Sequence, residues 1–385
     1  MKKFLALFIV AVLALSLVAC GTATPAPVKD NTPDNATVDN PPAASGSDIQ
    51  VGIVLPTKDE PRWLQDEKSF ADALTSAGFT YEVLFSAGSP ATEKANVDSL
   101  ITKGIKVLII CPHDSGAAAA TAQAARDAGV KVISYDRLIT GTDAVDYYVT
   151  FDSFAVGAAQ GQFLVDNASG TANNLYLFAG DAGDNNAFIF FEGAWSVLQP
   201  KIADGTFVIQ NSSEAVALKG SATMSRADGA EKIIAQITTQ WNFDVAKKLA
   251  ETMLAANNAD QKGVCFALAP NDGTGRAIFD AFDADNDVTK VFVTGQDAEQ
   301  ASIQYVIDGK QSMSVFKDTR VLAKDAVAIA AALLGGNAPA TTGEYDNQAI
   351  KVPAKQTAIV VITKDNVQKE LIDSGAFQAG DFTGL

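Results

Sequence analysis

The polar side chains of this chain that could bind or transform a ligand stand directly after short apolar runs. These segments are rich in Asp, Asn, Arg and Lys, and they are 56–63, 111–114, 135–137, 151–152, 180–186, 270–272, 295–297 and 316–318. Trp63 lies in the first of them, and Trp241 can join the set. Carboxylates, amides and cations all bond hydroxyl groups, and an indole face covers apolar C–H groups. This combination of residue types favours recognition of a neutral polyol such as a sugar.

Each of these polar residues also has a simpler interpretation. Asp and Asn after a strand are common helix N-caps, because their side chains accept hydrogen bonds from the first free amides of the helix. A single residue of this kind therefore identifies no site. The recurrence of the pattern along the chain is what favours a shared ligand.

An enzyme is the first alternative to a binding protein. Hydrolysis needs an acid paired with a base, or a nucleophile with a base, and the acids here are too numerous to exclude such a pair by counting. However, the chain has no G-x-S-x-G motif and no metal signature, and Cys111 and Cys265 lie inside apolar runs. We expect no enzymatic activity, no cofactor, no bound metal and two free internal thiols.

The composition excludes several other classes of protein. The 29 Lys and Arg residues stand against 45 Asp and Glu residues, so the net charge of −16 argues against a nucleic-acid partner. One His and three Cys argue against a zinc cluster and a disulfide scaffold. Asp283–Asp287 resembles the start of a calcium loop, but Val288 replaces its glycine and no Glu follows at the twelfth position. We interpret this stretch as a solvated loop.

The pattern of apolar residues predicts alternating strands and helices from Ile49 onward. β-branched runs that are apolar on both faces are typical of a parallel sheet covered by helices. In the first half the expected strands are 49–55, 80–85, 106–111 and 130–135, with helices at 64–77 and 115–128. The pattern restarts near Tyr147, and the full chain holds about twelve expected strands, which is too many for one open sheet. We therefore expect an α/β fold with two doubly wound parallel-sheet lobes. The segment 211–240 fits no element clearly.

The first residues indicate the cellular compartment. Lys2 and Lys3 precede the apolar run Phe4–Ala19, which is short for a membrane span and typical of a signal peptide. The run ends in Leu-Val-Ala-Cys-Gly, which resembles a bacterial lipobox with Cys20 as the lipidated residue. An ordinary signal peptide with an incidental cysteine is the alternative. We expect a signal peptide at 1–19, a proline-rich disordered tether at 20–48 and extracytoplasmic, lipid-anchored protein.

Several ordered strings of residues together resemble one family. They are Pro61-Arg62-Trp63, Gly104–Ile109, Tyr135-Asp136-Arg137, Phe151-Asp152, Asp184-Asn185-Asn186-Ala187, Asn271-Asp272, Gly295-Gln296-Asp297-Ala298 and Phe316-Lys317-Asp318. The chain resembles the periplasmic sugar-binding proteins of ABC importers of the ribose/galactose/xylose type, and especially their xylose-binding and multiple-monosaccharide-binding branches. The resemblance implies a type I periplasmic-binding-protein fold with three crossings between the lobes. The lobes would be 49–152 plus 318–352 and 153–317 plus 353–385, and the third crossing would lie near 352–355.

The resemblance also implies a set of sugar-binding residues. Arg62, Trp63, Asp136 and Arg137 would come from the first lobe. Asn185 or Asn186, Trp241, Asn271 and Asp297 would come from the second lobe, with Lys317 at the hinge. Trp63 and Trp241 would sandwich the ring of the sugar. His113 and Asp114 stand at a suitable strand end, but His113 is equally well explained as a structural donor.

The implied function is binding of a monosaccharide of the xylose, glucose, galactose or arabinose class. The implied partners are the subunits of an ABC permease with a cytoplasmic ATPase, with a chemoreceptor as a further candidate, and we expect a monomer. A receptor for a furanosyl signalling molecule or a nucleoside shares the fold and remains an alternative. A sugar-responsive transcription regulator also shares the fold, but this chain carries a signal peptide where a DNA-binding domain would stand.

Overall fold

The computed structural model describes residues 49–385. The predicted signal peptide, Cys20 and the predicted tether lie outside the described residues. Within the described part, no helix has both the length and the apolar character needed to cross a membrane.

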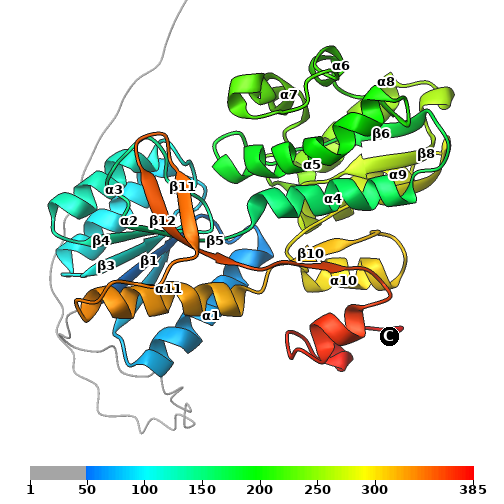
Figure 1. Ribbon diagram of the computed structural model, residues 1–385. Helices are drawn as coiled ribbons and strands as arrows, with labels where there is room; N and C mark the ends of the chain where they lie inside the picture. The colour runs from blue at the N-terminus through cyan, green and yellow to red at the C-terminus, as the bar shows by residue number, and fades with distance from the viewer. Residues whose placement is uncertain (1–48) are drawn as a thin grey trace, which may run out of the picture. The chain divides into compact units, whose positions relative to one another are not determined.

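The larger sheet has seven strands and lies between two layers of helices (Figure 1). Its order is β11 (Gly343–Asp346), β12 (Lys351–Thr357), β5 (Tyr147–Phe151), β4 (Lys131–Tyr135), β3 (Val107–Ile110), β1 (Val51–Leu55) and β2 (Tyr81–Phe85). Every pair is parallel except β11 with β12. The helices α1 (Pro61–Ala77) and α11 (Thr319–Leu334) bury apolar residues against one face, and α2 (Pro90–Thr102) and α3 (Ala118–Asp127) do so against the other.

The second lobe contains a four-stranded parallel sheet and a smaller pair of strands. The sheet order is β7 (Phe207–Ile209), β6 (Asn173–Leu177), β8 (Gly263–Leu268) and β9 (Val288–Val293), and the antiparallel pair is β10 (Ser314–Phe316) with β13 (Val360–Ile362). The helices of this lobe include α4 (Ser153–Asn167), α5 (Asn185–Ala203), α8 (Phe243–Ala256), α9 (Asp272–Asp283) and α10 (Gln300–Ile307). The predicted α/β fold with parallel sheets is therefore confirmed.

The segment that fitted no predicted element folds as two short helices. They are α6 (Ser213–Ala217) and α7 (Ala230–Ile237), with a 3₁₀ turn at Arg226–Asp228 between them. Ile233, Ile234 and Ile237 are fully buried in a core that they share with β6 and β8 of the four-stranded sheet. Tertiary burial rather than a long amphipathic pattern holds this segment, because neither helix is long enough to be stable alone.

The helices α4 and α5 approach each other to backbone contact. A Cβ atom on Gly157 would collide with the carbonyl oxygen of Phe190, and one on Gly193 would collide with that of Phe154. Glycine is needed at both positions because any side chain would separate the helices. The close approach brings the first turns of α4 and α5 together, and there Ser153 Oγ donates to Asn186 Oδ1 at 3.4 Å.

The third passage of the chain between the lobes differs from the expected one. Strand β12 remains paired with β5 as far as Thr357, and β13 begins at Val360. The predicted crossing at 352–355, with lobe boundaries at 352 and 353, therefore falls inside a strand of the larger sheet. Pro353 lies inside this strand although proline donates no backbone hydrogen bond. It is tolerated here opposite Glu344 of the edge strand β11.

Candidate functional site

A cavity lies where the carboxyl ends of strands from both lobes meet. It is lined by Glu60, Arg62, Trp63, Asp136, Arg137, Asp184, Asn186, Phe190, Trp241, Asn271, Gln296, Asp297 and Lys317. Most of the residues predicted from the sequence are in this set. The lining residues stand in the first turns of α1 and α5, at the N-caps of α5 and α9, and in the loops after β4 and β9. This is the edge at which open parallel sheets place ligands.

His113, Asp114 and Asn185 were also predicted for the site, but the structure does not bring them to the cavity wall. The backbone amide of His113 donates to Glu93 Oε2 at 2.8 Å, and Asp114 Oδ1 accepts from the amide of Ala117 at 2.7 Å. The amide of Asn185 donates to Ser115 Oγ at 3.1 Å. Of the three, Asp114 matches the N-cap interpretation, because its side chain accepts a hydrogen bond from a backbone amide, whereas the contacts of His113 and Asn185 are made by their backbone amides.

Four cavity residues were missing from the predicted set. Glu60, Asp184 and Gln296 lie next to predicted residues in the same polar segments, so the sequence held a signal for them. Phe190 lies one turn inside α5, among other phenylalanines that pack into the core. No local pattern distinguishes it from those neighbours.

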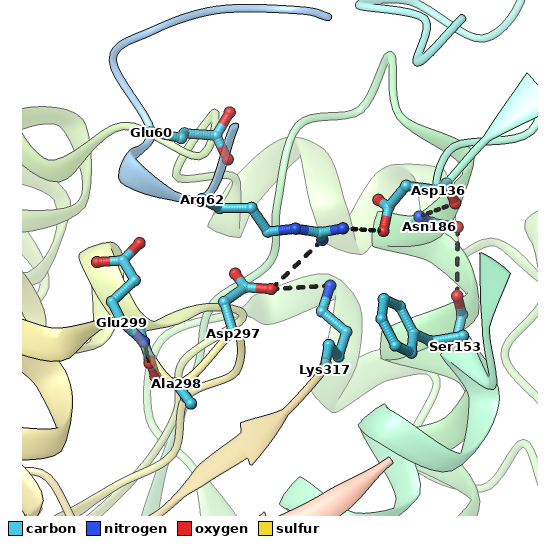
Figure 2. A network of polar contacts seen from close by, with 12 residues as sticks. Glu60, Arg62, Asp136, Ser153, Asn186, Asp297, Ala298, Glu299 and Lys317 are labelled. Atoms are coloured by element: carbon cyan, nitrogen blue, oxygen red, sulfur yellow. Dashed lines mark hydrogen bonds and ion pairs between the residues drawn. The ribbon is translucent and has the colours of Figure 1, made fainter. Parts of the chain in front are cut away.

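Arg62 is the centre of a buried ionic network (Figure 2). Its Nη2 lies 2.7 Å from Asp136 Oδ2 and its Nη1 lies 3.5 Å from Asp297 Oδ1. Its Nε also lies 3.0 Å from Asp66 Oδ2. Lys317 Nζ lies 2.8 Å from the same oxygen of Asp297. Burial alone would raise the pKa of Asp136, but Arg62 and Lys317 outweigh it and hold that pKa below its ordinary value. Asp136 is therefore ionised and presents a charged acceptor at neutral pH.

Arg137 forms a second network with carboxylates from both lobes. Its Nε lies 2.9 Å from Asp184 Oδ2 and its Nη2 lies 3.5 Å from Glu60 Oε1. Burial raises the pKa of Glu60 to about 7, although Arg137 opposes the shift. Burial also raises the pKa of Asp184, again against the effect of Arg137. At a pKa of about 7, Glu60 can either accept or donate a hydrogen bond near neutral pH.

Three of the lining residues adopt a left-handed backbone. The φ angles are 59° at Asp136, 56° at Trp241 and 98° at Asp297. This conformation is costly for residues other than glycine, and it is found mainly where the surrounding structure enforces it at functional sites. At Asp136 the amide donates to Val149 of the neighbouring strand at 2.7 Å, and at Asp297 the amide donates to Val315 at 2.8 Å.

The aromatic rings of the cavity are held by different neighbours. The guanidinium carbons of Arg62 and Arg137 lie 4.7 Å and 5.1 Å from the ring centre of Trp63. Phe190 meets Trp241 edge to face, with ring centres 6.3 Å apart and an angle of 76°. Both indoles line the same cavity, and the sandwich around a sugar stays a prediction.

The chemistry of the cavity suits an uncharged ligand with many hydroxyl groups. The cations Arg62, Arg137 and Lys317 are largely matched by the four carboxylates of the lining. Trp241 Nε1 and Gln296 Oε1 are among the buried polar atoms of the wall that have no hydrogen-bond partner in the described part of the chain. Such atoms usually have one, so they are a donor and an acceptor left for a ligand. In the described part of the chain no cluster of three His, Cys, Asp or Glu could hold a metal ion.

Comparison with known proteins agrees with this geometry. Residues 51–338 match the model of the periplasmic binding protein domain. The chain is 34% identical over 348 residues to a multiple sugar-binding periplasmic receptor of Rhizobium radiobacter, covering 88% of this chain and 93% of the receptor. It is 28% identical to the D-xylose-binding periplasmic protein of Escherichia coli, covering 86% and 92%.

A solved structure is more similar still. It is a carbohydrate transporter solute-binding protein from Chloroflexus aurantiacus in complex with D-glucose. The two chains are 66% identical with a TM-score of 0.85, and the match covers 87% of this chain and 98% of the other. The resemblance inferred from the sequence is confirmed, and the chain belongs to the periplasmic binding protein family.

Proposed function

We propose that this protein is an extracytoplasmic solute-binding protein that captures a monosaccharide for an ABC importer. The observation that carries the proposal is the cavity wall, in which cations and carboxylates balance one another beside two indoles. A sugar hydroxyl donates to a carboxylate and accepts from a guanidinium, so one ring can engage several such pairs at once. D-Glucose is the first candidate, because the solved relative that is 66% identical holds it.

Binding is expected to draw the two lobes together. Asp136 and Arg137 belong to the first lobe, whereas Asp184, Asn271 and Asp297 belong to the second. A ligand that contacts both sets binds a closed form more tightly than an open one and shifts the population toward it. Contacts such as Asn186 Nδ2 donating to the carbonyl of Asp136 at 2.9 Å support a closed form of this kind. Small-angle scattering should show a smaller radius of gyration with saturating sugar. An equal radius, with binding shown in the same sample, would overturn closure.

Isothermal titration calorimetry with a panel of sugars tests the proposed function. We expect heat and saturation with D-glucose, and the panel extends to D-xylose, D-galactose and L-arabinose. A furanosyl sugar and a nucleoside belong in the same experiment, because receptors for them share the fold. Binding of one of those two with no response to any aldopyranose would replace the proposal with the alternative.

Anchoring through Cys20 is part of the same proposal. The lipobox-like end of the apolar run and the proline-rich segment that follows it support this assignment. Mass spectrometry of the mature protein should find a lipidated cysteine at its N-terminus, and the Cys20→Ala variant should be released from membranes. An unmodified N-terminus at another residue would refute anchoring without affecting sugar binding. The permease, its ATPase and a chemoreceptor are the partners that the proposal implies.

A further inference from the structure

Gly180 lies directly behind the indole of Trp241. A Cβ atom built on Gly180 would overlap the ring atoms Cζ2, Cη2 and Cε2 of Trp241. Trp241 lines the cavity and Gly180 does not, so the indole separates this glycine from the ligand space. Gly180 is not among the glycines with positive φ, so the backbone conformation itself does not require glycine there. The absence of a side chain matters because the indole rests on the backbone.

The backbone beneath the indole is tied to the segment that carries it. Thr238 Oγ1 donates to the carbonyl of Gly180 at 2.8 Å, and the amide of Thr239 donates to the carbonyl of Ala179 at 2.8 Å. In return, the amide of Ala179 donates to the carbonyl of Ile237 at 3.0 Å. Strand end and loop are therefore locked at a fixed separation. An added side chain at position 180 could not be accommodated by a simple shift of the two backbones.

The indole itself is the part that must move. Its far end is the group that an added methyl would meet, and Phe190 already stands against its edge. The left-handed backbone at Gln240 and Trp241, with φ of 54° and 56°, fixes the direction from which the side chain leaves the loop. A side chain at position 180 would therefore push the indole away from Gly180, toward the cavity.

We infer that Gly180 is a positioning residue that sets the depth of the Trp241 ring, and with it the width of the space offered to the sugar. This inference rests on the proposed function, since it assigns a role in binding a sugar. Gly180 acts through Trp241 and does not touch the ligand. A stacking contact depends steeply on the distance between the ring and the sugar, because dispersion attraction falls off quickly away from the optimal contact distance.

The test compares Gly180→Ala with a matched control in calorimetric titrations with D-glucose. Gly220→Ala is the control, because a Cβ atom there meets nothing within 4 Å and φ is not positive. We expect Gly180→Ala to weaken D-glucose binding at least tenfold and Gly220→Ala to change it less than twofold. Thermal unfolding of each variant checks that the fold is retained. Wild-type affinity in Gly180→Ala would overturn the inference.

A double variant separates positioning from general damage. When Trp241→Ala removes the ring, the Gly180→Ala change has nothing to displace and should alter affinity less than twofold. An unchanged tenfold loss in that background would overturn the inference, as would a double variant that fails to fold when Trp241→Ala alone folds. If Gly180→Ala alone is unstable, this comparison still decides the case. Absence of sugar binding by the wild type would instead refute the proposed function.

Discussion

Each lobe contributes a similarly placed aspartate to the cavity, but the two aspartates are supported by different surroundings. Each holds an aspartate in the left-handed conformation at the end of a strand, and its amide donates to a carbonyl of the next strand. Asp136 directly follows β4 of the continuous seven-stranded sheet, and Tyr148 Oη also donates to its carbonyl at 2.7 Å. Asp297 lies in the loop after β9 of the four-stranded sheet, where an isolated bridge of Gln296 with Val315 joins the loop to β10.

This difference shows which half of the site is fixed by its own lobe. Arg62 forms an ion pair with Asp136, and Asp66 on α1 orients the guanidinium of Arg62 through a second ion pair. Tyr135 in turn donates a hydrogen bond to Asp66. Asp297 depends on Lys317, which directly follows β10 and precedes α11, where the chain passes back to the first lobe. The part of the site on the first lobe is therefore held in place by residues of that lobe. The part on the second lobe depends on Lys317, which lies where the chain crosses between the lobes.

The largest expected effect follows from this coupling. Asp297→Asn leaves Lys317 buried without an ion-pair partner among the described residues, whereas Asp136→Asn leaves Arg62 with Asp66 and Asp297. Asparagine tolerates the left-handed conformation, so mainly charge is removed. We expect Asp297→Asn to lower the free energy of unfolding by about 3 kcal/mol and Asp136→Asn by about 1–2 kcal/mol. Urea unfolding without sugar measures both.

A compensating change sharpens this prediction. Removing both charges with Asp297→Asn and Lys317→Met should restore most of the lost stability, because a buried pair costs little when both members are replaced. Equal losses of stability in Asp136→Asn and Asp297→Asn, or no recovery in the double variant, would show that the two aspartates are supported equally by their surroundings.

The pH dependence of stability tests the second network, in which Arg137 is shared between the lobes. Burial raises the pKa of Glu60 from 4.5 to about 7, so the folded protein binds a proton that the unfolded chain has lost in this window. The free energy of unfolding should therefore fall as pH rises from about 4.5 to about 7. Glu60→Gln should remove a part of this fall on the order of 3 kcal/mol.

Other buried carboxyls also contribute to the slope, so the comparison between variants carries the test. Glu251→Gln on the exposed face of α8 is the control and should leave the pH profile of the wild type unchanged. If the free energy of unfolding of Glu60→Gln changes with pH as steeply as that of the wild type, groups other than Glu60 cause the fall.

Replacing each of the two tryptophans with alanine compares how much each lobe contributes to the affinity for sugar. Trp63→Ala and Trp241→Ala should each weaken D-glucose binding by roughly 1–3 kcal/mol, because each removes an apolar face for the sugar ring. Trp63→Ala should also lower stability, since Arg62 and Arg137 stack on that ring. Calorimetry and thermal unfolding separate the two effects. Unchanged affinity in both variants would eliminate the sandwich.

The smallest expected effect concerns a contact between the lobes outside the cavity. Ser115 Oγ accepts from the amide of Asn185 at 3.1 Å, and the amide of Ser115 donates to the carbonyl of Gly183 at 2.9 Å. Ser115→Ala keeps the second bond and loses the first, so it should weaken sugar binding by about 0.5–1.5 kcal/mol. Ser99→Ala on the exposed side of α2 is the matched control. Equal affinities of the two variants would mean that this contact does not favour closure.

Much of the fold and most of the cavity could be predicted from the sequence. The strand expected at 130–135 is observed at Lys131–Tyr135, because β-branched residues buried on both faces leave few alternatives. The polar segments after β4 and β9, which hold Asp136, Arg137 and Asp297, were predicted to face a ligand because parallel strands carry whatever follows them to one edge.

The rest depended on tertiary context. Phe190 could not be distinguished from Phe188 and Phe191, because all three lie in one helix and only the neighbouring Trp241 gives the first a different role. His113 carries the residue type of a ligand contact, yet its backbone is engaged by Glu93, which lies twenty residues earlier in the chain. Distances of this kind are set by how helices pack and leave no local pattern.

The two internal cysteines have a practical consequence for chemical labelling. Cys111 and Cys265 are free, as predicted, and both are fully buried, Cys111 directly after β3 of the larger sheet and Cys265 within β8. Burial raises the pKa of the Cys265 thiol to about 12 and that of Cys111 well above its ordinary range. The thiolate is the form that attacks thiol reagents, so neither native cysteine should react at neutral pH while the protein is folded. A cysteine introduced on the surface of one lobe would accept a fluorophore selectively, and the native sequence of the folded part would need no other change.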